Sequence, residues 1–135
     1  MNLTTFTPLE IRQGALLSLD LIQIWGWREQ LLALPAEATC YGMVTAGRAV
    51  LDDPGAGRFE LRQGMFFALP EGGSVQGGAG LVIVQSGYRV LRQVGGPLET
   101  VGRLRYIDGC SDTLLISPPR LGEPCLNHLH IPPYT

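Results

Sequence analysis

Apolar residues recur along this chain in short segments that alternate with polar residues or are rich in β-branched and aromatic side chains. From residue 14 to 27 (GALLSLDLIQIWGW), leucine and isoleucine fall near a period of two, with breaks that predict a strand partly buried on both faces. Residues 39–51 and 58–61 follow, and the turn DDPGAG between them carries the aspartate, proline and glycines that favour turn dihedrals. This pair predicts a β-hairpin.

Two later apolar segments, residues 65–69 and 81–91, lie on either side of a glycine-rich patch and also have the composition of strands. The single helical candidate, residues 27–34 (WREQLLAL), is short for a stable helix. We therefore predict an antiparallel all-β fold with its main domain in residues 1–95. Residues 96–135 are predicted to form a β-rich extension with three more strands. This extension either packs on its own chain, swaps onto a neighbouring copy, or begins a second unit of the same kind.

Composition narrows the function classes. A length of 135 residues and an apolar fraction of 45% suit one hydrophobic core. The net charge is −2 and the arginines are scattered singly, so neither nucleic acid nor a membrane surface is expected as a partner. Cys40, Cys110 and Cys125 form no C-x-x-C pair and are odd in number, which argues against a disulfide framework. The chain lacks a secretory signal and a long apolar segment, so we predict a cytoplasmic protein.

The most specific motif is GMFFALPEG, from Gly64 to Gly72, in which a glycine is followed after five residues by Pro-x-Gly. Glycine permits positive φ and proline fixes φ, so the motif predicts a strand between two turns. Upstream, residues 41–51 supply a strand, a turn at Gly47 and a second strand. The two segments resemble the two conserved motifs of the cupin superfamily, over about residues 14–94. The resemblance implies a double-stranded β-helix, which is a jelly-roll barrel of antiparallel strands.

In the usual cupin, two histidines and a glutamate from the first motif and one histidine from the second hold iron, manganese, zinc or nickel inside the barrel. In this chain, the resemblance places the glutamate position at Cys40 and the paired histidines within residues 32–36 (LALPA). It places the last histidine at Val75. Because a cysteine and a valine do not rebuild a carboxylate and imidazole site, we expect no metal and no other cofactor there.

Aromatic residues near these positions point to an apolar ligand pocket instead. Its candidate lining residues are Trp25, Trp27, Cys40, Tyr41 and Val75. Core or interface packing is the more frequent role of such aromatic residues. Cys40 has no base or cation nearby in the sequence to activate its thiol, so we expect it to act as a small buried apolar side chain rather than a nucleophile.

The two histidines, His128 and His130, are two residues apart and would share one face of a strand, near enough to bind one ion. A third ligand would then have to come from Cys110, from an aspartate or from another subunit. In the alternative explanation, LNHLHIPP is the strand that leads into a second cupin motif, and both histidines have ordinary structural roles.

We therefore predict a metal-free cupin-like domain without enzymatic activity, which binds a small molecule, or has a structural or regulatory role, and forms a homodimer. One alternative is a metal-independent isomerase, epimerase or cyclase, whose acid–base candidates are Tyr41, Glu60, Glu71 and Tyr88. A metal-binding cupin that uses His128 and His130 is another. The last is a ligand-sensing module like those of arabinose-type regulators, although no helix-turn-helix pattern accompanies it.

Overall fold

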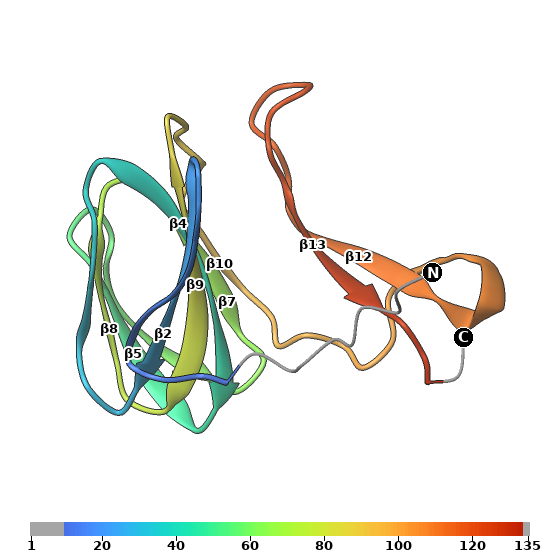
Figure 1. Cartoon of the computed structure of the whole chain (residues 1–135), viewed down its shortest axis with the longest axis horizontal. Helices are drawn as coiled ribbons and strands as arrows, with labels where there is room; N and C mark the ends of the chain where they lie inside the picture. Colours follow the sequence, from blue (N-terminus) through green and yellow to red (C-terminus); the bar gives the residue numbers. More distant parts are fainter. Residues whose placement is uncertain (1–9, 134–135) are drawn as a thin grey trace.

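The computed structural model describes residues 10–133, which form three antiparallel sheets in three layers (Figure 1). The central sheet has the strand order β1 (Gly14–Leu19), β2 (Ile22–Arg28), β9 (Ala79–Ser86), β4 (Ala38–Ala46), β7 (Phe66–Leu69), β10 (Gln93–Gly95). On one side lies a sheet of β3 (Leu32–Leu34), β8 (Gly73–Gln76), β5 (Arg48–Asp53), β6 (Gly57–Arg62). On the other side lies a sheet of β11 (Leu104–Arg105), β12 (Ser111–Ile116), β13 (Leu126–His130), with the 3-10 turn η1 (Ile107–Gly109).

The six-stranded and four-stranded sheets pack face to face as a sandwich whose interior is apolar. On β5, buried Ala49 and Leu51 alternate with exposed Arg48 and Val50, as expected of a strand with one face on a core. Inward side chains from both sheets form one cluster, and its largest fully buried members are Trp27, Val44, Leu51, Leu61, Phe67, Leu69, Val75 and Val82. We call this cluster the interior.

Glycines make room for the two large rings of the interior. A Cβ atom at Gly80 would lie 2.0 Å from the ring of Trp27, and one at Gly42 would lie 2.0 Å from the ring of Phe67. The Trp27 indole also donates a hydrogen bond from Nε1 to the Gly77 carbonyl oxygen at 2.7 Å. The backbone at Gly80 and Gly42 therefore packs tightly against the rings of Trp27 and Phe67.

The third sheet belongs to residues 96–133, which we call the C-terminal unit. It packs on the outer face of the six-stranded sheet, away from the interior (Figure 1). The contact joins Tyr41, Phe66, Ala68 and Val90 to Ile116 in a second buried cluster, with Leu98, Leu115 and Leu126 partly buried against it. Because both of its faces are covered, β4 is buried along most of its length.

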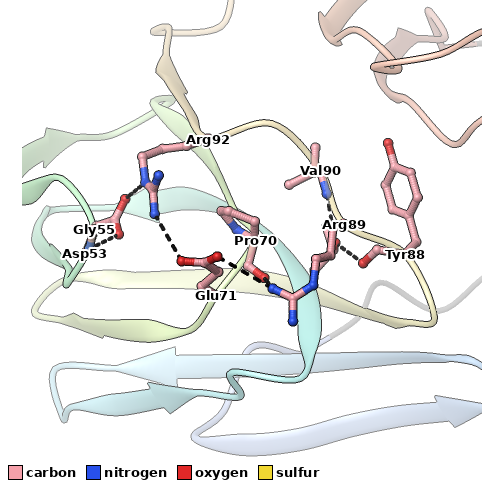
Figure 2. A network of polar contacts seen from close by, with 9 residues as sticks. Asp53, Gly55, Pro70, Glu71, Tyr88, Arg89, Val90 and Arg92 are labelled. Carbon is pink, nitrogen blue, oxygen red and sulfur yellow. Dashed lines mark hydrogen bonds and ion pairs between the residues drawn. The ribbon is translucent and has the colours of Figure 1, made fainter.

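A network of polar contacts attaches the segment after β9 to the sandwich (Figure 2). The fully buried Thr39 hydroxyl donates to the Tyr88 carbonyl oxygen and accepts a hydrogen bond from the Val90 amide at 3.1 Å. The side chain of Tyr88 points away from this network, and its hydroxyl donates to the Pro124 carbonyl oxygen of the C-terminal unit at 3.2 Å. One short segment thus links the C-terminal unit to the central sheet.

The same network holds one buried charge. Asp53 is 2% exposed, and its carboxylate accepts hydrogen bonds from Arg92 Nε at 2.5 Å and from the Gly55 amide at 2.9 Å. Glu71 lies beside Arg92 and Arg89 at the rim of the sandwich, where all three side chains are partly or largely exposed (Figure 2). Asp53 is therefore the one member of this group that depends on its partners for charge compensation.

The antiparallel all-β prediction is confirmed, and the helix candidate at 27–34 instead contains the end of β2 and all of β3. The predicted hairpin is confirmed only in part. Residues 48–53 pair with 57–62, but residues 38–46 belong to the other sheet because the chain turns sharply at Gly47, where φ is +69°. The predicted closed barrel is not seen, since none of the described sheets closes on itself. Between residues 10 and 133, no helix has the length and apolar character needed to cross a membrane.

Candidate functional site

An apolar cleft lies between the outer face of the six-stranded sheet and the C-terminal unit. Its volume is about 190 Å³. The sheet contributes Ile24, Tyr41, Gly42, Met43, Phe66, Leu81 and Ile83, and the C-terminal unit contributes Leu98, Leu115, Leu126, Asn127 and His128. The cleft thus combines a largely hydrophobic lining with a few polar groups, which is the usual make-up of a small-molecule site.

The strand pairing explains why these side chains meet. Tyr41 on β4 is directly opposite Ile83 on β9, and Ile83 is opposite Ile24 on β2, so one row of side chains crosses three strands on the same face. Met43 stands two residues further along β4 and therefore shares that face. Cys40, whose side chain points the other way, belongs to the interior.

The cleft adjoins a wider opening, which we call the vestibule, of about 500 Å³. The two share Phe66, Leu98, Leu115 and His128 as lining residues. The vestibule adds Thr113, Glu99 and Arg103, and Arg103 Nε donates to Glu99 Oε1 at 3.1 Å. The hydrogen bond and positive charge of Arg103 lower the pKa of Glu99, so the two groups remain an ion pair at neutral pH.

Tyr41 is the polar group most deeply buried at the cleft. The residue is 4% exposed, and its hydroxyl finds no hydrogen-bond partner of acceptable geometry among the described residues. Burial raises the pKa of the Tyr41 hydroxyl well above its usual range, and the nearby Tyr88 hydroxyl and Cys125 thiol raise it further. The Tyr41 hydroxyl therefore keeps its proton at neutral pH.

The structure separates the five pocket residues named from the sequence. Trp27, Cys40 and Val75 are fully buried in the interior, and Trp25 packs against the same cluster while half-buried. Only Tyr41 lines the cleft. Burial raises the pKa of the Cys40 thiol to about 12, so this cysteine is not ionised at neutral pH and is not an activated nucleophile.

His128 and His130 share one face of β13, and both are half-buried. His128 lines the cleft and the vestibule, whereas His130 Nδ1 is buried without a hydrogen-bond partner. Among residues 10–133, no group of three or more His, Cys, Asp or Glu side chains is arranged to hold a metal ion. The structure therefore supplies no third ligand next to these histidines within its described part.

The acid–base candidates named from the sequence are also dispersed. Glu60 is exposed on β6, and Glu71 forms ion pairs at the sandwich rim. Tyr88 contributes its hydroxyl to the contact with Pro124, close to Tyr41. Among these candidates, only Tyr41 lines the cleft.

Most of the cleft was not found from the sequence. Residues 38–46 contain apolar side chains on both faces of the strand, which is a sign that something covers the outer face. The covering residues, Leu115 and Leu126, come from the C-terminal unit, and no local pattern connects them to β4. Comparisons of this chain with protein-family models, with curated proteins and with solved structures find no match.

Proposed function

We propose that this chain is a cupin-like domain without enzymatic activity, which binds a small, mostly apolar molecule in the cleft between its central sheet and its C-terminal unit. The observation that carries the proposal is the cleft itself. An apolar cavity of roughly 150 Å³ is known to bind a benzene molecule, so about 190 Å³ suits a single ring with one substituent. The adjoining vestibule gives such a molecule a route to solvent.

The cupin-like part of the proposal is supported by the location of the residues that the resemblance assigns to metal-ligand positions. Leu32, Cys40 and Val75 belong to one interior cluster, and Leu32 is paired directly with Val75. The resemblance assigns metal ligands to Cys40, to Val75 and to positions within residues 32–36, which include Leu32. In this chain these three side chains are apolar and pack together. Gly64 and Gly72 of the motif both have positive φ, +86° and +82°, as the two turns around β7 require.

The proposed lack of catalysis is supported by the groups around the cleft. Glu99 and Arg103 neutralise each other, and the raised pKa of Tyr41 makes its hydroxyl a poor proton acceptor at neutral pH. The ligand would therefore be held rather than converted. Tight binding would then come from burial of its apolar surface.

A cavity-filling substitution tests this function. Toluene at ten times its Kd is expected to stabilise the native chain by about 1.4 kcal/mol, which raises Tm by roughly 4–6 °C. Met43→Trp places a ring inside the cleft and is expected to abolish this increase. Leu129→Trp, at a 56% exposed position outside the cleft, serves as the matched control and retains it. Absence of the increase in the native chain, or an equal increase in Met43→Trp, contradicts the proposal.

We also propose that the domain forms a homodimer through β1. In the six-stranded sheet β1 is an edge strand, and its Leu17 and Leu19 are 43% and 57% exposed, on the same outer face as Ile24 of the cleft. Two copies that pair edge to edge around a two-fold axis would continue both the sheet and this apolar face. A second copy would pair the free backbone groups of β1 and bury the exposed leucines at the same time.

Light scattering on the purified chain measures this association. We expect the mass of a dimer at micromolar concentration, and the mass of a monomer for Leu19→Lys, because a lysine would place two like charges in the paired edge. Leu121→Lys, in a fully exposed loop of the C-terminal unit, is expected to remain dimeric. A monomeric native chain would rule out the dimer.

A further inference from the structure

The cleft and the vestibule meet at a boundary that contains one polar side chain. Four residues line both cavities, and three of them, Phe66, Leu98 and Leu115, are apolar, whereas the fourth is His128. Any molecule that extends from the cleft into the vestibule therefore lies next to the imidazole ring of His128.

The pairing of β12 with β13 explains this change from apolar to polar. Ile116 pairs with Leu126, which lines the cleft, and Thr113 pairs with His128, which lines the vestibule as Thr113 does. Leu126 and His128 are two residues apart on one strand and therefore share a face. The face that the C-terminal unit turns towards the central sheet is thus apolar at its first pair and polar at its second. A ligand held against this face needs the same order of groups.

His128 is better placed to bind a ligand than the other polar side chains of the cleft. Its side chain is half-buried and forms no hydrogen bond or ion pair within the described part of the chain. The amide of Asn127, in contrast, already donates to Asp112 at 3.0 Å. The Tyr41 hydroxyl is shielded from solvent and lies close to Tyr88. His128 is therefore the polar side chain from which we derive the ligand class.

Charge around the boundary limits the polar group that such a ligand can carry. The vestibule is lined by Glu99 and Arg103, which are paired with each other at 3.1 Å. An ionised group would meet both signs of charge at once and gain little, whereas a neutral group keeps a low desolvation cost. A neutral imidazole ring has one donor and one acceptor nitrogen, and a hydroxyl group can bond to either. A hydroxyl group therefore suits His128 whichever nitrogen faces the vestibule.

We infer that the ligand of the cleft is a compact apolar alcohol, whose single ring lies in the cleft and whose hydroxyl group, on a short arm, forms a hydrogen bond with the His128 imidazole. This inference rests on the proposed function, because it assigns the ligand class of the same cleft. The cleft, of about 190 Å³, accommodates the ring. The wider vestibule keeps the hydroxyl group next to water, so its burial costs little.

Two probes of the same shape separate this inference from the proposed function. Benzyl alcohol carries a hydroxyl group where ethylbenzene carries a methyl group. The measured quantity is the ratio of the Kd of ethylbenzene to that of benzyl alcohol, obtained by titration calorimetry. We expect this ratio to fall roughly threefold to tenfold in His128→Leu, the effect of one lost hydrogen bond. His130→Leu, on the same face of β13 but outside the lining of both cavities, is the matched control and is expected to leave the ratio unchanged.

The Kd of ethylbenzene itself shows whether His128→Leu keeps a folded cleft, and we expect it to stay close to the native value. The imidazole NMR signals of His128 in the native chain give a second measurement that needs no variant. We expect benzyl alcohol to shift them more than ethylbenzene does, and this comparison decides the question if His128→Leu does not fold.

Three outcomes overturn the inference while the proposed function stands. They are equal ratios in the native chain and in His128→Leu, an equal fall of the ratio in His130→Leu, and equal shifts of the His128 signals with both probes. If neither probe binds the native chain, both the inference and the proposed function fail.

Discussion

The Trp27→Ala variant is expected to lose about 3–5 kcal/mol of unfolding free energy. Trp27 is fully buried in the interior, and its ring lies against Gly80, whose missing side chain makes that contact feasible. Truncation leaves a large cavity between the two sheets. It also removes the indole N–H group, which donates a hydrogen bond to the Gly77 carbonyl oxygen at 2.7 Å. Both effects act in the folded state and in the same direction.

Trp25 supplies the matched control because it lies two residues away on the same strand and packs against the same cluster. It is only half-buried, and its indole donates to the exposed Gln23 side chain at 2.9 Å. Trp25→Ala is therefore expected to cost at most about half as much as Trp27→Ala, since less apolar surface is lost. Urea unfolding followed by circular dichroism measures both variants. Equal losses would mean that the interior does not depend on Trp27.

The second large effect is expected at the buried carboxylate. Arg92→Met removes the side chain that pairs with Asp53 and leaves that carboxylate, 2% exposed, with the Gly55 amide as its remaining hydrogen-bond donor. The expected loss of unfolding free energy is larger than that for an exposed ion pair, because the buried Asp53 carboxylate is left without its charged partner. One third of the Arg92 side chain is exposed, so solvent screens part of this effect.

Arg89→Met is the control for this prediction. Arg89 also forms an ion pair with Glu71, but both side chains are about two thirds exposed and lie 3.7 Å apart. Its loss is expected to change the unfolding free energy by less than about 1 kcal/mol. The two variants can be compared at pH 7 by denaturant unfolding. If Arg89→Met destabilises the chain as much as Arg92→Met, burial of Asp53 is not the source of the effect.

Local patterns in the sequence predict the strands but not their arrangement into sheets. The turn between residues 53 and 57 forms the hairpin that its aspartate, proline and glycine predict. The apolar pattern of residues 39–51 predicts one arm of a hairpin, and the cupin resemblance adds a turn at Gly47. In the structure this single left-handed residue divides the run between two sheets. Pairings such as β4 with β9 and β3 with β8 join distant segments, and no local pattern encodes such register.

At the candidate site, too, local patterns predict the direction of side chains along a strand but not the contacts between distant segments. Alternation along a strand places Cys40 and Tyr41 on opposite faces, but it does not say which face is the interior. From the sequence, three aromatic residues and two residues at expected metal-ligand positions are predicted to line one pocket. In the structure, the C-terminal unit creates the cleft on the far side of the central sheet, so only Tyr41 reaches it.

The central claim is that a small apolar molecule binds in the cleft and not in the interior. Methyl NMR spectra of the native chain, recorded during a toluene titration, test it most directly. We expect saturable shifts at Met43, Ile83 and Leu115, which line the cleft, and none at Leu51 and Val75, which lie in the interior. Shifts at the interior methyl groups, or no saturable shift at the cleft, would contradict the account.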